Sequence, residues 1–181
     1  MTIVRALVPA DIAAVTRIYA QDVLNGTGTF EEIPPSSGEM RRRAETIAAA
    51  RLPWLVADTG GAVVGYSYAA QFHIRSAYRY TLEDAVYIDS AYRSRGVGRA
   101  LLGELIARCE ALGYRQMIAR IGDSANRGSI ALHKALGFEN MGFYQSAGLK
   151  FGRWLDVVLM QRALGAGADT VPPGDPVSGG A

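Results

Sequence analysis

The order of the predicted elements indicates one mixed α/β or α+β domain. Its 181 residues fit a single domain. Strand patterns outnumber helical ones, and strands alternate with helices in the middle of the chain alone, so a fully parallel sheet is not expected. A content of 49% hydrophobic and 20% charged residues is typical of a globule that buries a core without disulfides.

The first half of the chain predicts four strands and two helices. Pro9 and Asp11 open a helix, and Asn25-Gly26-Thr27-Gly28 ends it. Ser36 and Glu39 have the spacing of a capping box, which starts a second helix that runs to about Arg51. The segment 74–80 is expected to be irregular. The expected strands are Ile3–Leu7, Trp54–Asp58, Val63–Gln71 and Leu82–Ile88.

The second half predicts two helices and three strands. An amphipathic helix follows Gly98 and ends at Gly113, with Leu101, Leu105 and Cys109 among its apolar positions. A short helix of about 126–136 is stopped by Gly137. The remaining strands are Gln116–Ile121, Glu139–Ser146 and Trp154–Arg162. Residues 165–181, with five glycines and three prolines, are expected to form a disordered tail after a domain of residues 1–164.

Charge and cysteine content exclude several classes of protein. A net charge of +2 is too small to favour nucleic acid or a membrane surface as a partner. The single cysteine, Cys109, rules out an internal disulfide and a cysteine-based zinc site, and no metal is expected. The chain shows neither a signal peptide nor a transmembrane run, so we expect a cytoplasmic protein.

A glycine turn at a helix start is the strongest functional motif. The backbone N–H groups that begin a helix are free and carry the positive end of the helix dipole, so they bind anions. Arginines surround this turn, and a pyrophosphate suits it. A Walker loop would need Gly-Lys-Ser/Thr, and a dinucleotide fold would need a third glycine, where Leu101 stands. Coenzyme A fits the spacing, and a solvated surface turn is the alternative. The motif comprises Arg93, Ser94, Arg95, Gly96, Val97, Gly98 and Arg99.

With a second motif, the chain resembles the GNAT superfamily of N-acetyltransferases. Arg93-Ser-Arg-Gly96-Val-Gly98 is similar to its acetyl-CoA signature, and the segment from Asn126 through Ser129 and His133 to Gly137-Phe138 is similar to its second motif. The resemblance implies the GNAT fold, with a mixed central sheet of about six to seven strands flanked by about four helices. It also implies acetyl-CoA as cosubstrate.

The chain further resembles the phosphinothricin and methionine sulfoximine acetyltransferase branch of this superfamily. The segments that carry this resemblance are Thr29-Phe30-Glu31, Pro53–Ala57, Arg75–Glu83 and Lys150–Asp156. The branch often has Asn-Ala-Ala-Ser where this chain has Asn126-Arg127-Gly128-Ser129, which puts a charge beside the cofactor arm.

Glu83 and His133 are the predicted catalytic residues. Acetyl transfer requires an amine to lose a proton and a thiolate to gain one. Glu83 lies in an apolar strand, where partial desolvation favours proton uptake, and the resemblance implies a catalytic Glu here that acts through a water. The alternative is a Glu paired with Arg75 or Arg79. His133 could give a proton, or it could just hydrogen-bond the cofactor. Cys109 is expected to pack in the core.

The resemblance also assigns the binding residues. It implies that the backbone of Val86, Tyr87 and Ile88 pairs with pantetheine, and that Asn126 binds the same arm, with Ser129 beside it. For the acceptor it implies Phe30 and the segment Arg75, Ser76, Ala77 and Tyr78, in which the arginine suits a carboxylate or phosphinate.

These observations predict an acetyl-CoA-dependent N-acetyltransferase for the α-amino group of an amino-acid analogue such as phosphinothricin, methionine sulfoximine or methionine sulfone. The alternatives are another amine acceptor, such as a protein N-terminus or a polyamine, and a non-catalytic CoA-sensing module. The resemblance also implies a homodimer.

Overall fold

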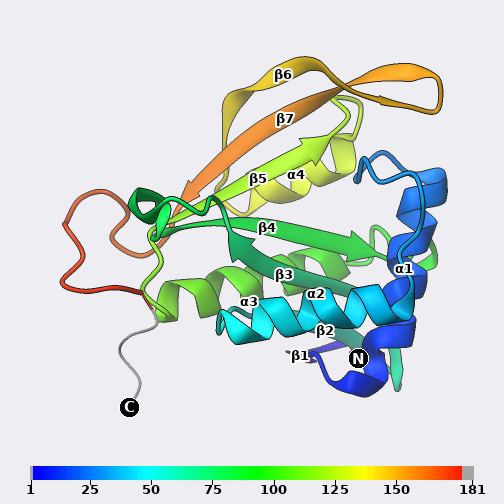
Figure 1. The fold of residues 1–181 in the computed structure, drawn as a ribbon, viewed down its shortest axis with the longest axis horizontal. Coiled ribbons are helices and arrows are strands. Elements are labelled where there is room, and N and C mark those ends of the chain that lie inside the picture. The colour runs from blue at the N-terminus through cyan, green and yellow to red at the C-terminus, as the bar shows by residue number, and fades with distance from the viewer. Residues whose placement is uncertain (1, 177–181) are drawn as a thin grey trace.

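A computed structural model describes residues 2–176 as seven strands and four α-helices, with three short 3-10 turns (Figure 1). The strands are β1 (Thr2–Ala6), β2 (Trp54–Thr59), β3 (Ala62–Gln71), β4 (Thr81–Ile88), β5 (Gln116–Gly122), β6 (Glu139–Lys150) and β7 (Arg153–Ala163). The helices are α1 (Ile12–Asn25), α2 (Ser37–Ala49), α3 (Val97–Ala111) and α4 (Arg127–Ala135), and the turns are η1 (Pro9–Asp11), η2 (Ser76–Tyr78) and η3 (Ser90–Tyr92).

The seven strands form one sheet in the order β1-β2-β3-β4-β5-β7-β6. Every neighbouring pair is antiparallel except β4 and β5, which run parallel. The parallel pair joins at Thr81↔Gln116 and continues through Glu83↔Ile118, a ladder of three residue pairs. Beyond it β4 and β5 diverge, so the sheet opens in its middle (Figure 1).

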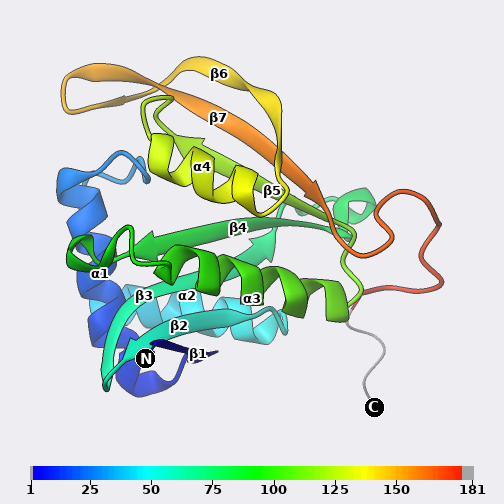
Figure 2. The ribbon, with the colours of Figure 1, turned by 180° about the vertical axis from the view of Figure 1, so that it is seen from behind.

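Helices cover both faces of the sheet and bury two hydrophobic clusters. On one face, α1 and α2 pack on β2 and β3, with Val15, Ile18 and Met40 almost fully buried. On the other face, seen in Figure 2, α3 packs its row of Leu101, Leu105 and related residues against the sheet. The opening between β4 and β5 therefore lies in a sheet that carries a closely packed hydrophobic cluster on each face.

The predicted fold class and the order of elements are confirmed. One detail of capping differs. The Ser36 hydroxyl accepts the Glu39 amide at 3.1 Å, but the Glu39 carboxylate binds Arg42 and Arg43 instead of closing a capping box. The last hairpin is also longer than predicted. β6 runs to Lys150 and β7 begins at Arg153, because Phe151 and Gly152 form a tight turn with φ of 52° and 70°.

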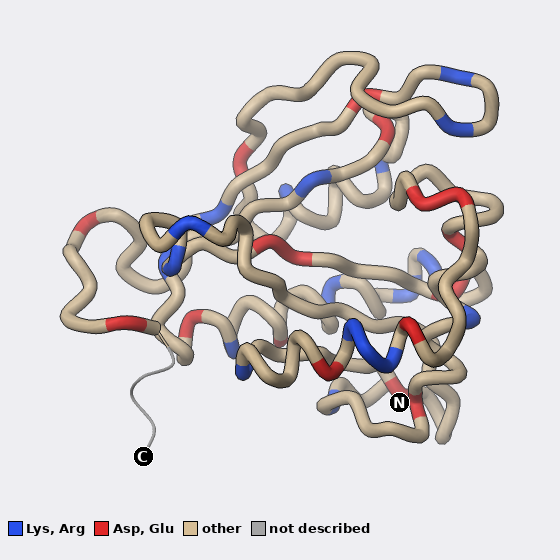
Figure 3. Tube along the Cα trace, in the orientation of Figure 1, with Lys and Arg blue, Asp and Glu red and all other residues tan. Residues whose placement is uncertain are grey.

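The segment after β7, as far as it is described, returns to the loops that precede β4 and β5. The hydroxyl of Tyr80 donates to the Gly174 carbonyl at 2.6 Å, and Arg115 donates to Thr170 at 3.2 Å. Residues 177–181 of the tail expected to be disordered lie outside the described residues, and the division at residue 164 stays a prediction. Among residues 2–176, no helix is long and apolar enough to cross a bilayer. Basic and acidic residues are interspersed along the trace (Figure 3).

Candidate active site

A cleft of about 1090 Å³ occupies the opening between β4 and β5. Its walls come from α1 and the loop after it, from β4 and β5, and from the starts of α3 and α4. Because β4 has no strand partner on this side beyond Glu83, the backbone groups that follow are free to pair with an extended ligand. These include the predicted cofactor residues Val86, Tyr87 and Ile88, which all line the cleft.

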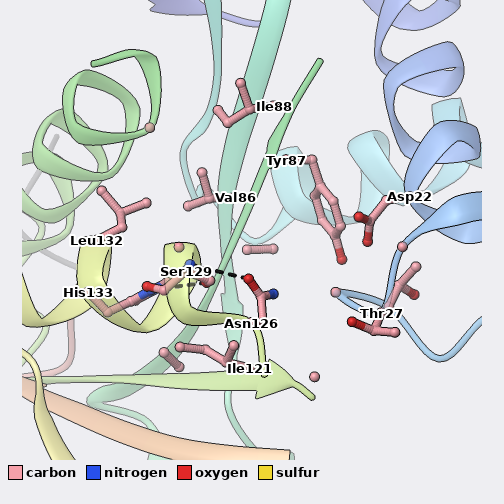
Figure 4. A pocket seen from close by; sticks show the side chains of 18 of the residues that line it. Asp22, Thr27, Val86, Tyr87, Ile88, Ile121, Asn126, Ser129, Leu132 and His133 are labelled. Carbon is pink, nitrogen blue, oxygen red and sulfur yellow. Dashed lines mark hydrogen bonds between the residues drawn. The ribbon is translucent and has the colours of Figure 1, made fainter. Parts of the chain in front are cut away.

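Alternate residues of β4 point to the two faces of the sheet. Val86 and Ile88 pack against the core under α3, whereas Tyr87 packs against Tyr19 and Tyr66 on the α1 side. Figure 4 shows this division, with Tyr87 near Asp22 and Thr27, and with Val86 on the side of Leu132 and His133. The cleft therefore has an α3/α4 side and an α1 side, joined through the sheet.

The start of α3 forms the first wall of the α3/α4 side. Gly96 precedes the helix with φ of 81°, a left-handed conformation that favours glycine, and no side chain caps the free N–H groups. A Cβ on Gly98 would lie 3.0 Å from Leu132 Cδ2, so glycine permits close packing of α3 on α4. Arg93, Ser94 and Arg99 also line the cleft. This arrangement suits an anionic group at the helix start.

Two residues of the predicted glycine motif face elsewhere. The guanidinium of Arg95 lies over the Tyr92 ring, 5.4 Å from its centroid. Val97 is buried in the core under α3. Neither is among the described residues that line the cleft.

The start of α4 forms the second wall. The side chain of Asn126 caps this helix by accepting a hydrogen bond from the Ser129 amide at 3.3 Å (Figure 4). Arg127 and Gly128, at the positions where the resembling branch often has two alanines, line the cleft together with Asn126 and Ser129. Two helix N-termini therefore point into one side of the same cleft.

His133 is buried and both of its ring nitrogens have partners. Nε2 lies 3.0 Å from Asp84 Oδ2, and Nδ1 lies 2.7 Å from the Ser129 carbonyl oxygen. Burial lowers the pKa of His133, but the Asp84 carboxylate and the Ser129 carbonyl outweigh burial and raise this pKa above 6.5. Because both partners are acceptors, they favour an imidazolium that donates from both nitrogens.

Glu83 lies on the α1 side and is held by Arg120 of β5. Arg120 Nε donates to Glu83 Oε1 at 2.7 Å, and Nη2 lies 2.6 Å from Oε2, so the guanidinium grips both carboxylate oxygens. The side chain of Glu83 is 22% exposed and that of Arg120 is 53% exposed. Both line the cleft. The expected structural partners of Glu83, Arg75 and Arg79, do not contact it in the described contacts.

The loop between α1 and α2 closes the α1 side of the cleft. Buried Lys150 of β6 donates to the carbonyls of Gly26 and Thr29 at 2.9 Å and 2.8 Å. Burial lowers the pKa of Lys150, while Asp22 opposes this. A Cβ on Gly122 would overlap the Thr27 carbonyl oxygen. This cation and this glycine therefore fix the position of residues 26–30.

Phe30 completes this wall. Its ring packs so closely on Gly148 that a Cβ there would overlap the ring. Phe30 lines the cleft, and its role in binding the acceptor stays a prediction. The tyrosines behind it stay neutral, because burial raises the pKa of Tyr68 to about 12 and that of Tyr87 well above its ordinary value. The aromatic part of the wall is thus uncharged, and the carboxylates that line the cleft beside it are Asp22, Glu83 and Asp123.

The segment Arg75–Tyr78, expected to bind the acceptor, lies apart from the cleft lining. Residues 76–78 form η2, and the ring of Tyr78 packs on Phe72 and His73. Arg75, Ser76, Ala77 and Tyr78 are not among the described residues that line the cleft. Their role in binding stays a prediction.

Comparison with known proteins identifies the family. Residues 4–159 match the family model of the acetyltransferase (GNAT) domain. The chain belongs to the GNAT acetyltransferase family. The predicted family, its fold and the predicted branch are confirmed, since the relatives below are N-acetyltransferases of that branch.

Two relatives and one solved structure illustrate the similarity. The chain is 52% identical to phosphinothricin N-acetyltransferase of Alcaligenes faecalis, over 93% of this chain and 86% of the relative. It is 39% identical to the L-methionine sulfoximine/L-methionine sulfone acetyltransferase of Pseudomonas aeruginosa, over 86% and 90%. A GNAT phosphinothricin acetyltransferase from Sinorhizobium meliloti, solved with acetyl-CoA, superposes with a TM-score of 0.94 at 49% identity, over 98% and 97% of the two chains.

Three features of this GNAT site were not predicted from the sequence. These are the ion pair of Arg120 with Glu83, the pairing of Asp84 with His133, and the hydrogen bonds of Lys150 to the 26–30 loop. One local signal existed for Arg120, because it is a charge that alternates with apolar Ala119 and Ile121 in a strand. The other two contacts join residues that are separated by 49 and by 121 positions in the sequence, so no local pattern predicts them.

Proposed function

We propose that this GNAT protein transfers the acetyl group of acetyl-CoA to the α-amino group of a small amino-acid analogue of the phosphinothricin, methionine sulfoximine or methionine sulfone type. One observation carries the proposal. The cleft between β4 and β5 combines two helix N-termini on one side with a carboxylate, Glu83, on the other. The relatives named above support the choice of acceptor.

The residues on the α3/α4 side fit acetyl-CoA. The uncapped start of α3, with Arg93 and Arg99, suits a pyrophosphate. The unpaired backbone from Val86 to Ile88 suits the amides of an extended pantetheine arm. When bound, acetyl-CoA supplies an activated acetyl thioester. The free N–H groups along β4 can also stabilise negative charge on the acetyl oxygen.

Glu83 is the proposed base. It takes a proton from the acceptor ammonium, through a water as the resemblance implies, and so frees the nitrogen lone pair. The nitrogen then bonds to the acetyl carbon, the carbon–sulfur bond breaks, and the departing thiolate takes up the second proton that the nitrogen loses as it becomes an amide. The two hydrogen bonds of His133 support a positioning role, in which His133 fixes α4 against β4.

Other readings of the site are less well supported. A CoA-sensing module has no need of a carboxylate such as Glu83 facing the cleft. A protein N-terminus would require a broader acceptor side than one whose loop is fixed by Lys150 and Gly122.

We also propose a cytoplasmic homodimer. The hairpin of β6 and β7 projects from the body of the molecule (Figure 1) and carries large exposed apolar side chains that a second copy could cover. These are Met141, Phe143, Tyr144, Leu149, Phe151 and Trp154. Light scattering should give twice the chain mass, and a monomer at micromolar concentration would contradict the proposal.

A thiol-release assay tests the function. Acetyl-CoA is offered with a panel that contains phosphinothricin, methionine sulfone, spermidine and an alanine-terminated peptide. CoA release with the two amino-acid analogues, and a much lower rate with the others, is the expected result. Binding of acetyl-CoA with no release in any sample would favour the sensing module.

A further inference from the structure

Arg120 is the cation that lies beside Glu83 on the acceptor side of the cleft. Four arginines line the cleft as a whole. Arg99 lies at the start of α3 and Arg127 begins α4, on the side that suits acetyl-CoA. Arg93 precedes α3, and its Nη2 lies 3.6 Å from Asp22 Oδ1 of α1. Arg120 lies in β5 and turns to the opposite side, where it meets Glu83.

The Arg120–Glu83 pair presents opposite charges at the spacing of an amino-acid head group. Their charged atoms are 2.6 Å and 2.7 Å apart. An α-amino acid carries its ammonium and its carboxylate on one carbon. A ligand with this head group can therefore place its ammonium beside Glu83 and its carboxylate beside Arg120 at the same time.

We propose that Arg120 binds the α-carboxylate of the acceptor while Glu83 takes the proton from its α-ammonium. The inference rests on the proposed function and names the part of the acceptor that the site recognises. Binding replaces the Arg120–Glu83 pair with one contact from each residue to the substrate. The guanidinium thereby leaves the base at the moment when the acceptor arrives.

The exposure of the pair permits this exchange. The side chain of Arg120 is 53% exposed, and an ion pair in contact with water contributes about 0–1 kcal/mol, so a zwitterion can compete with it. The fork of a guanidinium also suits a carboxylate better than a single positive charge does. Tyr68 lies near Glu83 and Tyr144 near Arg120, and Tyr68 is neutral. No second carboxylate contacts Arg120 in the described contacts.

Recognition of the head group explains why acceptors with different side chains can share one site. Phosphinothricin carries an anionic side chain, whereas that of methionine sulfone is neutral, and both are α-amino acids. Arg120 would select for the carboxylate that they share, and the Phe30 wall would contact the part in which they differ.

The test compares methionine sulfone with its carboxamide, which has the same side chain and amine but no α-carboxylate. For the unaltered protein we expect kcat/KM to fall about tenfold to a hundredfold from acid to amide, as for loss of a charge-assisted hydrogen bond. Arg120→Gln should abolish the preference for the acid, so that kcat/KM for acid and amide agree within about twofold. For Arg120→Lys, kcat/KM with the acid should lie between the values for the unaltered protein and for Arg120→Gln. The KM for acetyl-CoA should stay unchanged in both variants. Arg108→Gln, on the outer face of α3, is the matched control.

Each other outcome overturns the inference. An equal loss for acid and amide would mean that Arg120 serves Glu83 alone. A preference for the acid that persists in Arg120→Gln would mean that the carboxylate binds elsewhere. Calorimetric titration with methionine sulfone of CoA-loaded protein, unaltered and Arg120→Gln, tests the same subsite without turnover. Equal affinity in the two proteins would overturn the inference. If the unaltered protein binds this acceptor but acetylates nothing, the proposed function fails while the subsite stands.

Discussion

The two sides of the cleft are built in different ways. The α3/α4 side consists mainly of backbone, with helix N-termini at Gly96 and Asn126 and the unpaired edge of β4. The α1 side consists of side chains from distant segments, with Arg120 on Glu83 and Lys150 on the 26–30 loop. Backbone sites recognise a fixed cosubstrate, and side-chain sites can change without loss of the fold. We therefore expect substitutions to damage one side while sparing the other.

The largest effect is expected from Glu83→Gln. The amide keeps the size of the side chain but cannot take a proton, so kcat should fall by about 10²–10⁴-fold. The affinity for acetyl-CoA, measured by calorimetry, should stay unchanged because Glu83 lies on the α1 side. Glu104→Gln, at an exposed pair with Arg108 on α3, is the control. Unchanged turnover in Glu83→Gln would remove Glu83 from its role.

Gly98→Val should produce the converse pattern. The new side chain would crowd Leu132, and such overpacking typically lowers the free energy of unfolding by about 1–3 kcal/mol. Because it also displaces the start of α3, we expect the affinity for acetyl-CoA to fall by about tenfold, or about 1.4 kcal/mol of binding free energy. The KM for the amino-acid acceptor should change little. A shift in acceptor KM with acetyl-CoA affinity intact would break the division between the two sides.

Gly122→Ala tests the loop on the α1 side. Its Cβ would displace the Thr27 carbonyl and with it the 26–30 loop. We expect the acceptor KM to rise about tenfold, which corresponds to about 1.4 kcal/mol of binding free energy. Steady-state kinetics at saturating acetyl-CoA measures this. If the acceptor KM stays constant and the KM for acetyl-CoA rises instead, residues 26–30 do not form the acceptor wall.

Asp84→Asn tests the buried partner of His133 through stability. The pKa of His133 is raised in the folded protein, so the pair stabilises fully below the ordinary His value of about 6.5, and this stabilisation is lost as pH rises through the folded-state pKa. The variant should lose about 1–3 kcal/mol in free energy of unfolding at pH 5.5 and less at pH 9. Urea unfolding at both pH values checks this. An equal loss at both would contradict a charged His133.

The smallest effect is expected from Gly103→Ala. Gly103 lies inside α3 with open space where a Cβ would be, so alanine should raise the free energy of unfolding by up to about 1 kcal/mol through helix propensity. Neither KM should change. A decrease in thermal midpoint would show that glycine has a packing role at this position.

The sequence predicts the α3/α4 side better than the α1 side for a physical reason. A helix start is encoded within a few residues, so Gly96 and Gly98 signal it directly. Arg120, Lys150 and Asp84 act on residues 37, 121 and 49 positions away, and the topology of the sheet decides these contacts. For the same reason the strand that carries Glu83 could be predicted, but its partner Arg120 could not.

The divergence of β4 and β5 also bears on the order of events during turnover. The cleft opens on both faces of the sheet, so the two substrates can enter from opposite sides without passing one another. Acetyl transfer can then occur directly within a ternary complex. Cys109, the one thiol of the chain, is buried in the core and its pKa is raised to about 12, so it offers no site for a covalent acyl-enzyme. Double-reciprocal plots should therefore intersect instead of running parallel.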